Sequence, residues 1–303
     1  KAYSSLAEES MREALKPDDS GSASGQEKRR EAARLFARSA DRYQELADTL
    51  PQKMTEIRAK AALAKSRSYL SRINEQTPDQ EALMLAEKAM AALDSAASNS
   101  NEEKKARILI LKKITEGLWQ ACRTDPIAHD PQEIRAALSS SAEYLMDAAG
   151  SLVPWGAAKS LRQALESIKS AIETEISGTE QEKKQEAASA LRRANCEYIA
   201  PVNADAFSSM IERAAEMLEA ADRLPGRGGD GGRENDAGEE DGSQSLAWEQ
   251  ERAALLALAE AMMIYGLSDL EKDDETPAQE DSPELPEKDL MQDDSILVEI
   301  SQE

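Results

Sequence analysis

The sequence predicts an all-α protein built from about four antiparallel helical hairpins, arranged as a helical-repeat solenoid or as a bundle. Its 303 residues are rich in Ala and Leu, and only 4% of them are aromatic. Runs of β-branched residues are scarce, so the composition favours long helices over sheets. Helix-start signals recur at intervals of roughly fifty residues, which is typical of stacked or bundled hairpins.

The helix starts are well specified. Thr77 and Asp130 each place a capping oxygen before a proline, with an amide or carboxylate three residues after the cap. The same pattern without proline begins helices at Ser100 and Thr179. The hairpins are predicted to begin near residues 26, 78, 130 and 180, and their second helices near residues 51, 101, 154 and 203. Short loops between such helices make them antiparallel neighbours. Ahead of them, residues 2–16 read as a short amphipathic helix.

Residues 104–122 are predicted to form a helix with a wide apolar arc. Ile108, Leu111 and Leu118 fall on one broad apolar arc, and Leu109 alone points into the charged arc. A helix with so wide an apolar arc contacts neighbours on more than one side. It is therefore predicted to lie in the centre of the core.

The chain divides into four predicted segments. They are a helical-hairpin domain (1–225), a flexible Gly-rich linker (226–244), a docking helix (245–266) and an acidic disordered tail (267–303). The tail ends in a short β-prone stretch (295–300). The formal net charge is −22, and residues 226–303 hold 23 acidic and 5 basic residues. The body is thus nearly neutral, and the acidic end is expected to serve interaction or solubility.

The predicted docking helix is apolar on nearly every side. Such a helix on a tether cannot remain in water, so it is expected to dock either on the body or on a partner. The residues expected to carry this docking are Leu255, Leu258 and Met262. The apolar window is interrupted by Glu260 and is too short to span a bilayer.

The β-prone stretch of the tail is a second candidate for partner binding. Its apolar positions are Ile296, Leu297, Val298 and Ile300, preceded by two aspartates. Such a segment can add a strand to the edge of a partner's sheet. The alternative is that it packs on its own body.

The second long helix carries a cationic face, which is the predicted binding surface of the body. Its members are Arg58, Lys60, Lys65, Arg67 and Arg72. Only Glu56 opposes them on that helix, and small residues such as Ala61, Ala64 and Ser68 lie between them. An approaching surface is therefore expected to come close. Its ligand would be an acidic protein partner, nucleic-acid phosphate, or the chain's own acidic tail docking intramolecularly.

A second basic pattern lies on the first long helix. Arg30, Arg34, Arg38 and Arg42 form a stripe at four-residue spacing, and acidic residues interleave with it. Such interleaving predicts salt bridges within the helix.

Catalytic and cofactor signals are weak. The single histidine, His129, lies in a predicted loop, and Cys122 and Cys196 stand far apart without a second thiol beside either. The match of residues 226–231 to GxGxxG follows a helix and precedes an acidic run, which is the wrong context for binding a dinucleotide. We therefore expect no cofactor, no metal site and no enzymatic activity.

These features together predict a non-catalytic, soluble, cytoplasmic protein that binds protein partners as a scaffold, adaptor or regulator. The first alternative is a nucleic-acid-associated regulator that uses the basic helix face, covered by the acidic tail. An enzyme is the second alternative. No membrane association is expected, because no sufficiently long apolar segment is present.

Overall fold

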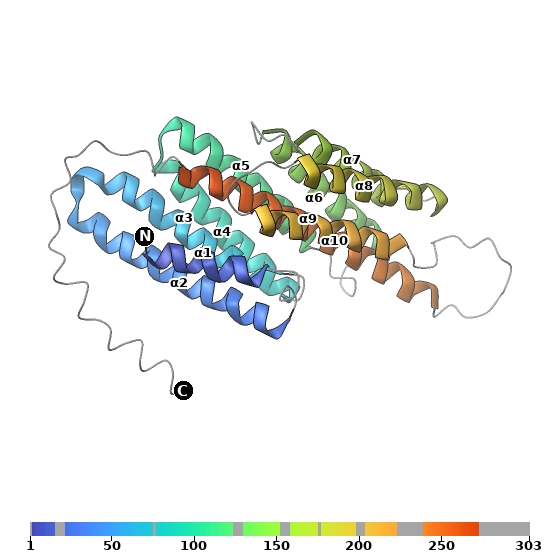
Figure 1. Cartoon of the computed structure of the whole chain (residues 1–303), viewed down its shortest axis with the longest axis horizontal. Helices are drawn as coiled ribbons and strands as arrows, with labels where there is room; N and C mark the ends of the chain where they lie inside the picture. The colour runs from blue at the N-terminus through green and yellow to red at the C-terminus, as the bar shows by residue number, and fades with distance from the viewer. Residues whose placement is uncertain are drawn as a thin grey trace. The chain divides into compact units, whose positions relative to one another are not determined.

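The computed structural model describes residues 2–15, 22–74, 77–123, 130–151, 158–174, 177–197, 204–222 and 239–272. In these ranges the chain forms helices and no strands, which confirms the all-α prediction (Figure 1). The helices are α1 (Ala2–Ala14), α2 (Ala23–Thr49), α3 (Met54–Leu70), α4 (Asp79–Ser98), α5 (Glu102–Ala121), α6 (Pro131–Ser151), α7 (Ala158–Glu173), α8 (Ser177–Glu197), α9 (Ala204–Asp222) and α10 (Glu239–Lys272). A 3-10 turn, Pro51–Lys53, precedes α3.

Successive helices pack side by side along the chain. Contacts join α1 to α2, α2 to α3 and so on through α8 and α9. The predicted hairpins correspond to α2 with α3, α4 with α5, α6 with α7 and α8 with α9. Packing of each helix against its chain neighbours fits the predicted helical repeat or bundle.

Local sequence explains where several of these helices begin. The Asp130 side chain accepts a hydrogen bond from the Gln132 amide at 3.1 Å, at the predicted cap. The cap predicted at Ser100 lies one residue later, because the Asn101 side chain accepts from the Lys104 amide at 2.9 Å, while the Ser100 hydroxyl donates to the Ala96 carbonyl at 2.8 Å. The start predicted at Thr179 is also wrong, because α8 begins at Ser177. The predicted cap at Thr77 is wrong, because its hydroxyl turns back and donates to the Arg72 carbonyl at 2.9 Å. As a result, α4 begins after Pro78 with no side-chain cap.

Helix α5 lies in the core, as its sequence predicts. Ile108 and Ile114 are fully buried, whereas Leu109 is 43% exposed. Gly117 brings α5 close to α6, since a Cβ atom at this position would lie 3.0 Å from the Leu145 Cγ atom. A larger residue at Gly117 would push the two helices apart.

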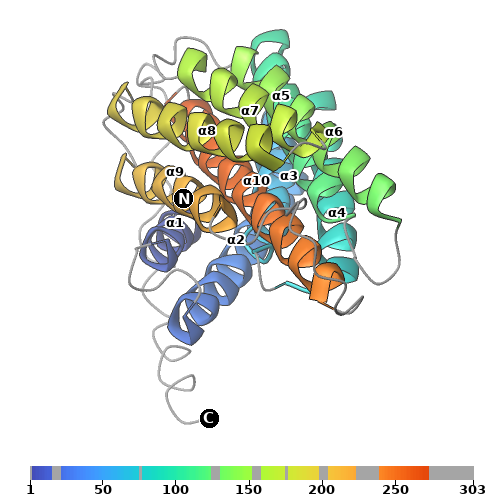
Figure 2. The same cartoon turned by 90° about the vertical axis from the view of Figure 1, so that its right-hand side faces the viewer.

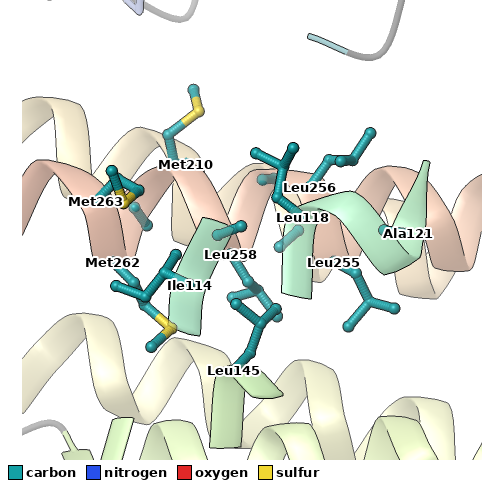
Figure 3. Packing of buried hydrophobic residues seen from close by; sticks show 14 of the residues in the cluster. Ile114, Leu118, Ala121, Leu145, Met210, Leu255, Leu256, Leu258, Met262 and Met263 are labelled. Carbon is teal, nitrogen blue, oxygen red and sulfur yellow. The ribbon is translucent and has the colours of Figure 1, made fainter. Parts of the chain in front are cut away.

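Helix α10 docks on the body, which is one of the two outcomes expected from its sequence. It belongs to the same compact unit as the other helices, residues 1–270. Figure 2 shows it running among them. Figure 3 shows its leucines and methionines against side chains of α5, α6 and α9. The helix is longer at both ends than predicted, because it begins at Glu239 inside the predicted linker and ends at Lys272 inside the predicted tail.

Other predictions concern residues outside the described ranges. They are the linker residues 226–238, the acidic tail from residue 273 with its β-prone stretch 295–300, and His129. Within the described part of the chain, none of the helices combines the length and apolar character needed to cross a membrane.

Candidate functional site

The cationic residues predicted on α3 are partly neutralised by neighbouring helices. Arg67 forms an ion pair with Glu8 of α1 at 2.9 Å, and its guanidinium lies 5.7 Å from the centre of the Phe36 ring. Arg72 pairs with Glu81 of α4 at 2.7 Å. Lys60 pairs with Glu56 on its own helix at 3.0 Å. Of the two remaining cations, Lys65 is exposed and Arg58 is half-buried.

The small residues between these cations do not leave a path for a partner, so that part of the prediction is wrong. Ala61, Ala64 and Ser68 are buried. The Ser68 hydroxyl donates to the Ala33 carbonyl of α2 at 2.8 Å. Helix α3 packs between α2 and α4, and its small side chains accommodate the close approach of α2.

A cavity of about 460 Å³ lies between α2, the C-terminal end of α3 and the start of α4. Among the residues that the structure describes, four arginines and one carboxylate line it: Arg29, Arg30, Arg34, Arg72 and Glu81. Ala33 and Ala37 contribute apolar surface, and Ser68, Asn74 and Thr77 are among its polar residues. The volume is within the range of small-ligand sites in proteins, roughly 300–1,000 Å³.

Two of the four arginines are already engaged by carboxylates. Arg29 is 5% exposed and donates through both terminal nitrogens to Glu260 of α10, at 2.7 and 3.0 Å. Arg72 is held by Glu81, as described above. These two pairs position the walls of the cavity without adding net charge to it.

The other two arginines carry the surplus charge. Arg30 and Arg34 are exposed and form no ion pair with any residue that the structure describes. The salt bridges predicted within the α2 stripe are therefore not formed at these positions, whereas Arg42 does pair with Glu45 at 3.0 Å. The cavity therefore carries surplus positive charge, which the interleaved acidic residues of α2 did not predict.

The start of α4 adds to this positive character. Pro78 lies on the cavity wall, and it offers no side-chain cap to the first turn of the helix. The N-terminus of a helix carries a partial positive charge. The acidic residues of this turn are opposed by cations, since Asp79 pairs with Arg252 of α10 and Glu81 with Arg72.

A buried ionic group fixes the other side of α10. Lys184 of α8 is 2% exposed and lies 2.6 Å from Glu180 and 2.9 Å from Glu251 of α10. Burial lowers the pKa of Lys184, but the Glu251 and Glu180 carboxylates more than offset this, so the pKa is raised. The lysine therefore remains charged at neutral pH and holds α8 to α10.

The predicted docking residues of α10 lie in the core. Leu255, Leu258 and Met262 are all 0% exposed. They stabilise the body and are not available on its surface. The other apolar candidates, Ile296, Leu297, Val298 and Ile300, lie outside the described residues.

The cysteine described by the structure does not have the environment of a nucleophile. Cys122 is fully buried, and burial raises the pKa of its thiol to about 11. The thiol is thus protonated at neutral pH. Among the described residues there is no group of three or more His, Cys, Asp and Glu side chains arranged to hold a metal ion.

Sequence reasoning missed Arg29 and the three charged residues of α10 that bind other helices. A usable signal was present, because Glu251, Arg252 and Glu260 interrupt an otherwise apolar helix. A charge in such a helix requires a partner from another element when the helix is buried. The pattern does not reveal which element supplies that partner.

The fold and the cavity define an all-helical protein with an arginine-lined surface site. No protein-family model, no curated protein and no solved structure matches the chain significantly.

Proposed function

We propose that the protein is a non-catalytic interaction protein that binds an acidic segment of a protein partner at the arginine-lined cavity. The observation that carries the proposal is the presence of Arg30 and Arg34 at this cavity without carboxylate partners among the described residues. Guanidinium groups bind carboxylates and phosphates through paired, charge-assisted hydrogen bonds. An acidic segment would supply the missing counter-charge.

Two fixed parts of the cavity lining support this role. Arg29 is anchored by Glu260, and the Thr77 hydroxyl donates to the Arg72 carbonyl and accepts from the Asn74 amide. A partner that enters a preorganised site loses less affinity to the ordering of side chains. The cavity is therefore suited to recognition.

The character of the cavity lining favours a protein partner over nucleic acid. None of the described residues that line it is aromatic, whereas proteins that bind single-stranded nucleic acid stack bases on aromatic side chains. Glu81 is the carboxylate among the described lining residues, and it is engaged by Arg72. This arrangement supports binding over acid–base catalysis.

Affinity capture with immobilised full-length protein tests the proposal. The variant R30E/R34E reverses the surplus charge, and R38E is the matched control, because Arg38 is exposed on the same stripe but does not line the cavity. We expect protein partners retained by wild type and R38E, released by high salt, and absent from R30E/R34E. Exposed charges are screened by salt, so release by salt indicates an electrostatic contact.

Two outcomes would contradict the proposal. If the same proteins remain on R30E/R34E as on wild type, the cavity is not the binding site. If nuclease treatment abolishes all capture, the cavity serves nucleic acid, and the alternative of a nucleic-acid-associated regulator replaces the proposal.

A further inference from the structure

We infer that the group recognised in the cavity is a phosphomonoester, carried by a phosphorylated serine or threonine side chain of the partner. This inference rests on the proposed function and narrows it. Carboxylates of an acidic segment and phosphomonoesters are both anions. The charge, geometry and size of the cavity distinguish between them.

The charge of the cavity fits a doubly charged ligand. Arg29 and Arg72 are each opposed by one carboxylate, from Glu260 and Glu81. Arg30 and Arg34 remain, and together they carry two positive charges. A phosphomonoester carries a charge of about −1.5 to −2 at pH 7. A single carboxylate carries only one negative charge and would leave half of the surplus unbalanced, so an unphosphorylated acidic segment would have to place two carboxylates at the cavity.

The placement of the two arginines fits a group with several acceptor oxygens. Residues one turn apart on a helix have Cβ atoms roughly 5–6 Å apart, so Arg30 and Arg34 can converge on one group. A phosphoryl group offers three terminal oxygens and can accept hydrogen bonds from both guanidinium groups at once. A carboxylate has only two oxygens. When one guanidinium group binds both of them, neither is left for the second arginine.

The start of α4 provides an independent contribution to the lining. Pro78 borders the cavity and leaves the first turn of the helix without a side-chain cap. Phosphate groups bind favourably at such helix ends, because the dipole and the backbone amides both favour negative charge. The Glu81 carboxylate, which also lines the cavity, is neutralised by Arg72.

The size of the cavity indicates that more than the phosphoryl group enters. A volume of about 460 Å³ would leave a lone phosphate ion surrounded mostly by water. Ala33 and Ala37 add an apolar wall on the α2 side. A short side chain that bears the phosphate can therefore contact this wall while its oxygens bind the arginines.

Isothermal titration of the full-length protein tests the inference with three probes at pH 7.5. They are N-acetyl-phosphoserine methylamide, N-acetyl-glutamate methylamide and inorganic phosphate. We expect the phosphoserine probe to bind about tenfold more tightly than the glutamate probe, because one additional charge-assisted hydrogen bond contributes roughly 1.5 kcal/mol. Binding should be lost in R30A/R34A and retained in R38A.

A pH comparison sharpens the result. The second pKa of a phosphomonoester is about 6, so lowering the pH from 7.5 to 5 converts most of the dianion to the monoanion. We expect the affinity for the phosphoserine probe to fall severalfold. Binding of the glutamate probe should change less over this range, because its carboxylate remains mostly ionised.

The outcomes separate this inference from the proposed function. Equal affinity for the glutamate and phosphoserine probes would overturn the phosphomonoester assignment, while loss of partner capture by R30E/R34E would still support the proposed function. Inorganic phosphate binding as tightly as the phosphoserine probe would overturn the assignment to a side chain. Equal loss of binding in R38A and R30A/R34A would show attraction to the stripe as a whole and overturn the cavity as the site.

Discussion

Three charged residues of α10 are paired with other helices, whereas two exposed arginines of α2 at the cavity are not. On α10, Glu251, Arg252 and Glu260 each form an ion pair with a different helix, namely α8, α4 and α2. On α2, by contrast, Arg30 and Arg34 have no carboxylate partner in the described part of the chain. The first set holds the longest helix in place, and the second set is available for binding.

The difference follows from burial. A charged group taken out of water must be paired, because its desolvation otherwise costs several kcal/mol. Glu251 and Lys184 are buried and close together. Exposed cations such as Arg30 remain solvated at little cost, so folding places no demand on their partners. The buried pairs therefore stabilise the fold, and we propose that the unpaired arginines at the cavity bind a partner.

The largest expected loss of stability comes from substitutions on the buried apolar surface of α10. Replacing both Leu255 and Leu258 with Asp removes two fully buried side chains and places two carboxylates in the core. Each change costs more than the roughly 2–5 kcal/mol of a buried Leu→Ala substitution. Because typical domains are stable by only about 5–15 kcal/mol, we expect the double variant not to fold.

Circular dichroism and urea denaturation measure this effect. The matched control is L109D, since Leu109 is 43% exposed on α5, and it should retain cooperative unfolding near the wild-type midpoint. If the double variant also unfolds at that midpoint, α10 is not part of the core. For the same reason, we expect residues 1–225, the predicted helical-hairpin domain, not to fold without α10, because α10 shares their core.

The second effect concerns the buried ionic group on the other side of α10. Replacing Lys184 with Met leaves the Glu180 and Glu251 carboxylates without their cation, and we expect a loss of about 3–5 kcal/mol in the free energy of unfolding. The neighbouring Lys183 is the control, because its pair with Glu186 is substantially exposed. K183M should change stability by less than about 1 kcal/mol. Equal losses would show that burial does not distinguish the two pairs.

A smaller effect arises from the pKa of Cys122. The thiol pKa is raised from 9.0 to about 11, chiefly by burial. Below pH 9 the thiol is protonated in both the folded and unfolded states. As the pH rises through 9 it ionises only when unfolded, so stability falls between pH 9 and 11, by on the order of 2 kcal/mol.

Urea denaturation of wild type and C122A at several pH values between 8 and 10.5 measures this slope. The variant lacks the thiol, so its stability should decline less steeply over this range than that of wild type, whatever its stability at pH 8. Parallel curves for the two proteins would mean that the Cys122 thiol ionises equally readily in the folded and unfolded states.

Most of the secondary structure was predictable from local sequence. The cap at Asp130 acts within one turn, and the cap of α5, predicted at Ser100, lies one residue later at Asn101. The apolar arc of α5 follows from the spacing of its own residues. Exposure of Leu109 followed from the same periodicity. The surroundings of α3 did not follow, because helices on both sides bury its small residues and obscure its amphipathic pattern.

The candidate site was less predictable because it depends on residues distant in the sequence. Arg29 and Glu260 are separated by 231 positions, and no pattern in either helix identifies the other. Interleaved acids suggested that Arg30 and Arg34 would be paired within α2. Spacing permits such a pair, but the side-chain conformation decides whether it forms, and here it does not.

Adjacent arginines on α2 allow the contrast between paired and unpaired charges to be tested at one place. Arg29 is buried and bound to Glu260, whereas Arg30 is exposed and has no carboxylate partner among the described residues. The free energy of unfolding of R29M and R30M, measured by urea denaturation, compares them. We predict a loss of about 2–4 kcal/mol for R29M, which leaves a largely buried carboxylate unpaired, and a change within about 0.5 kcal/mol for R30M. Equal destabilisation by the two substitutions would contradict the division of these charges into structural and binding groups.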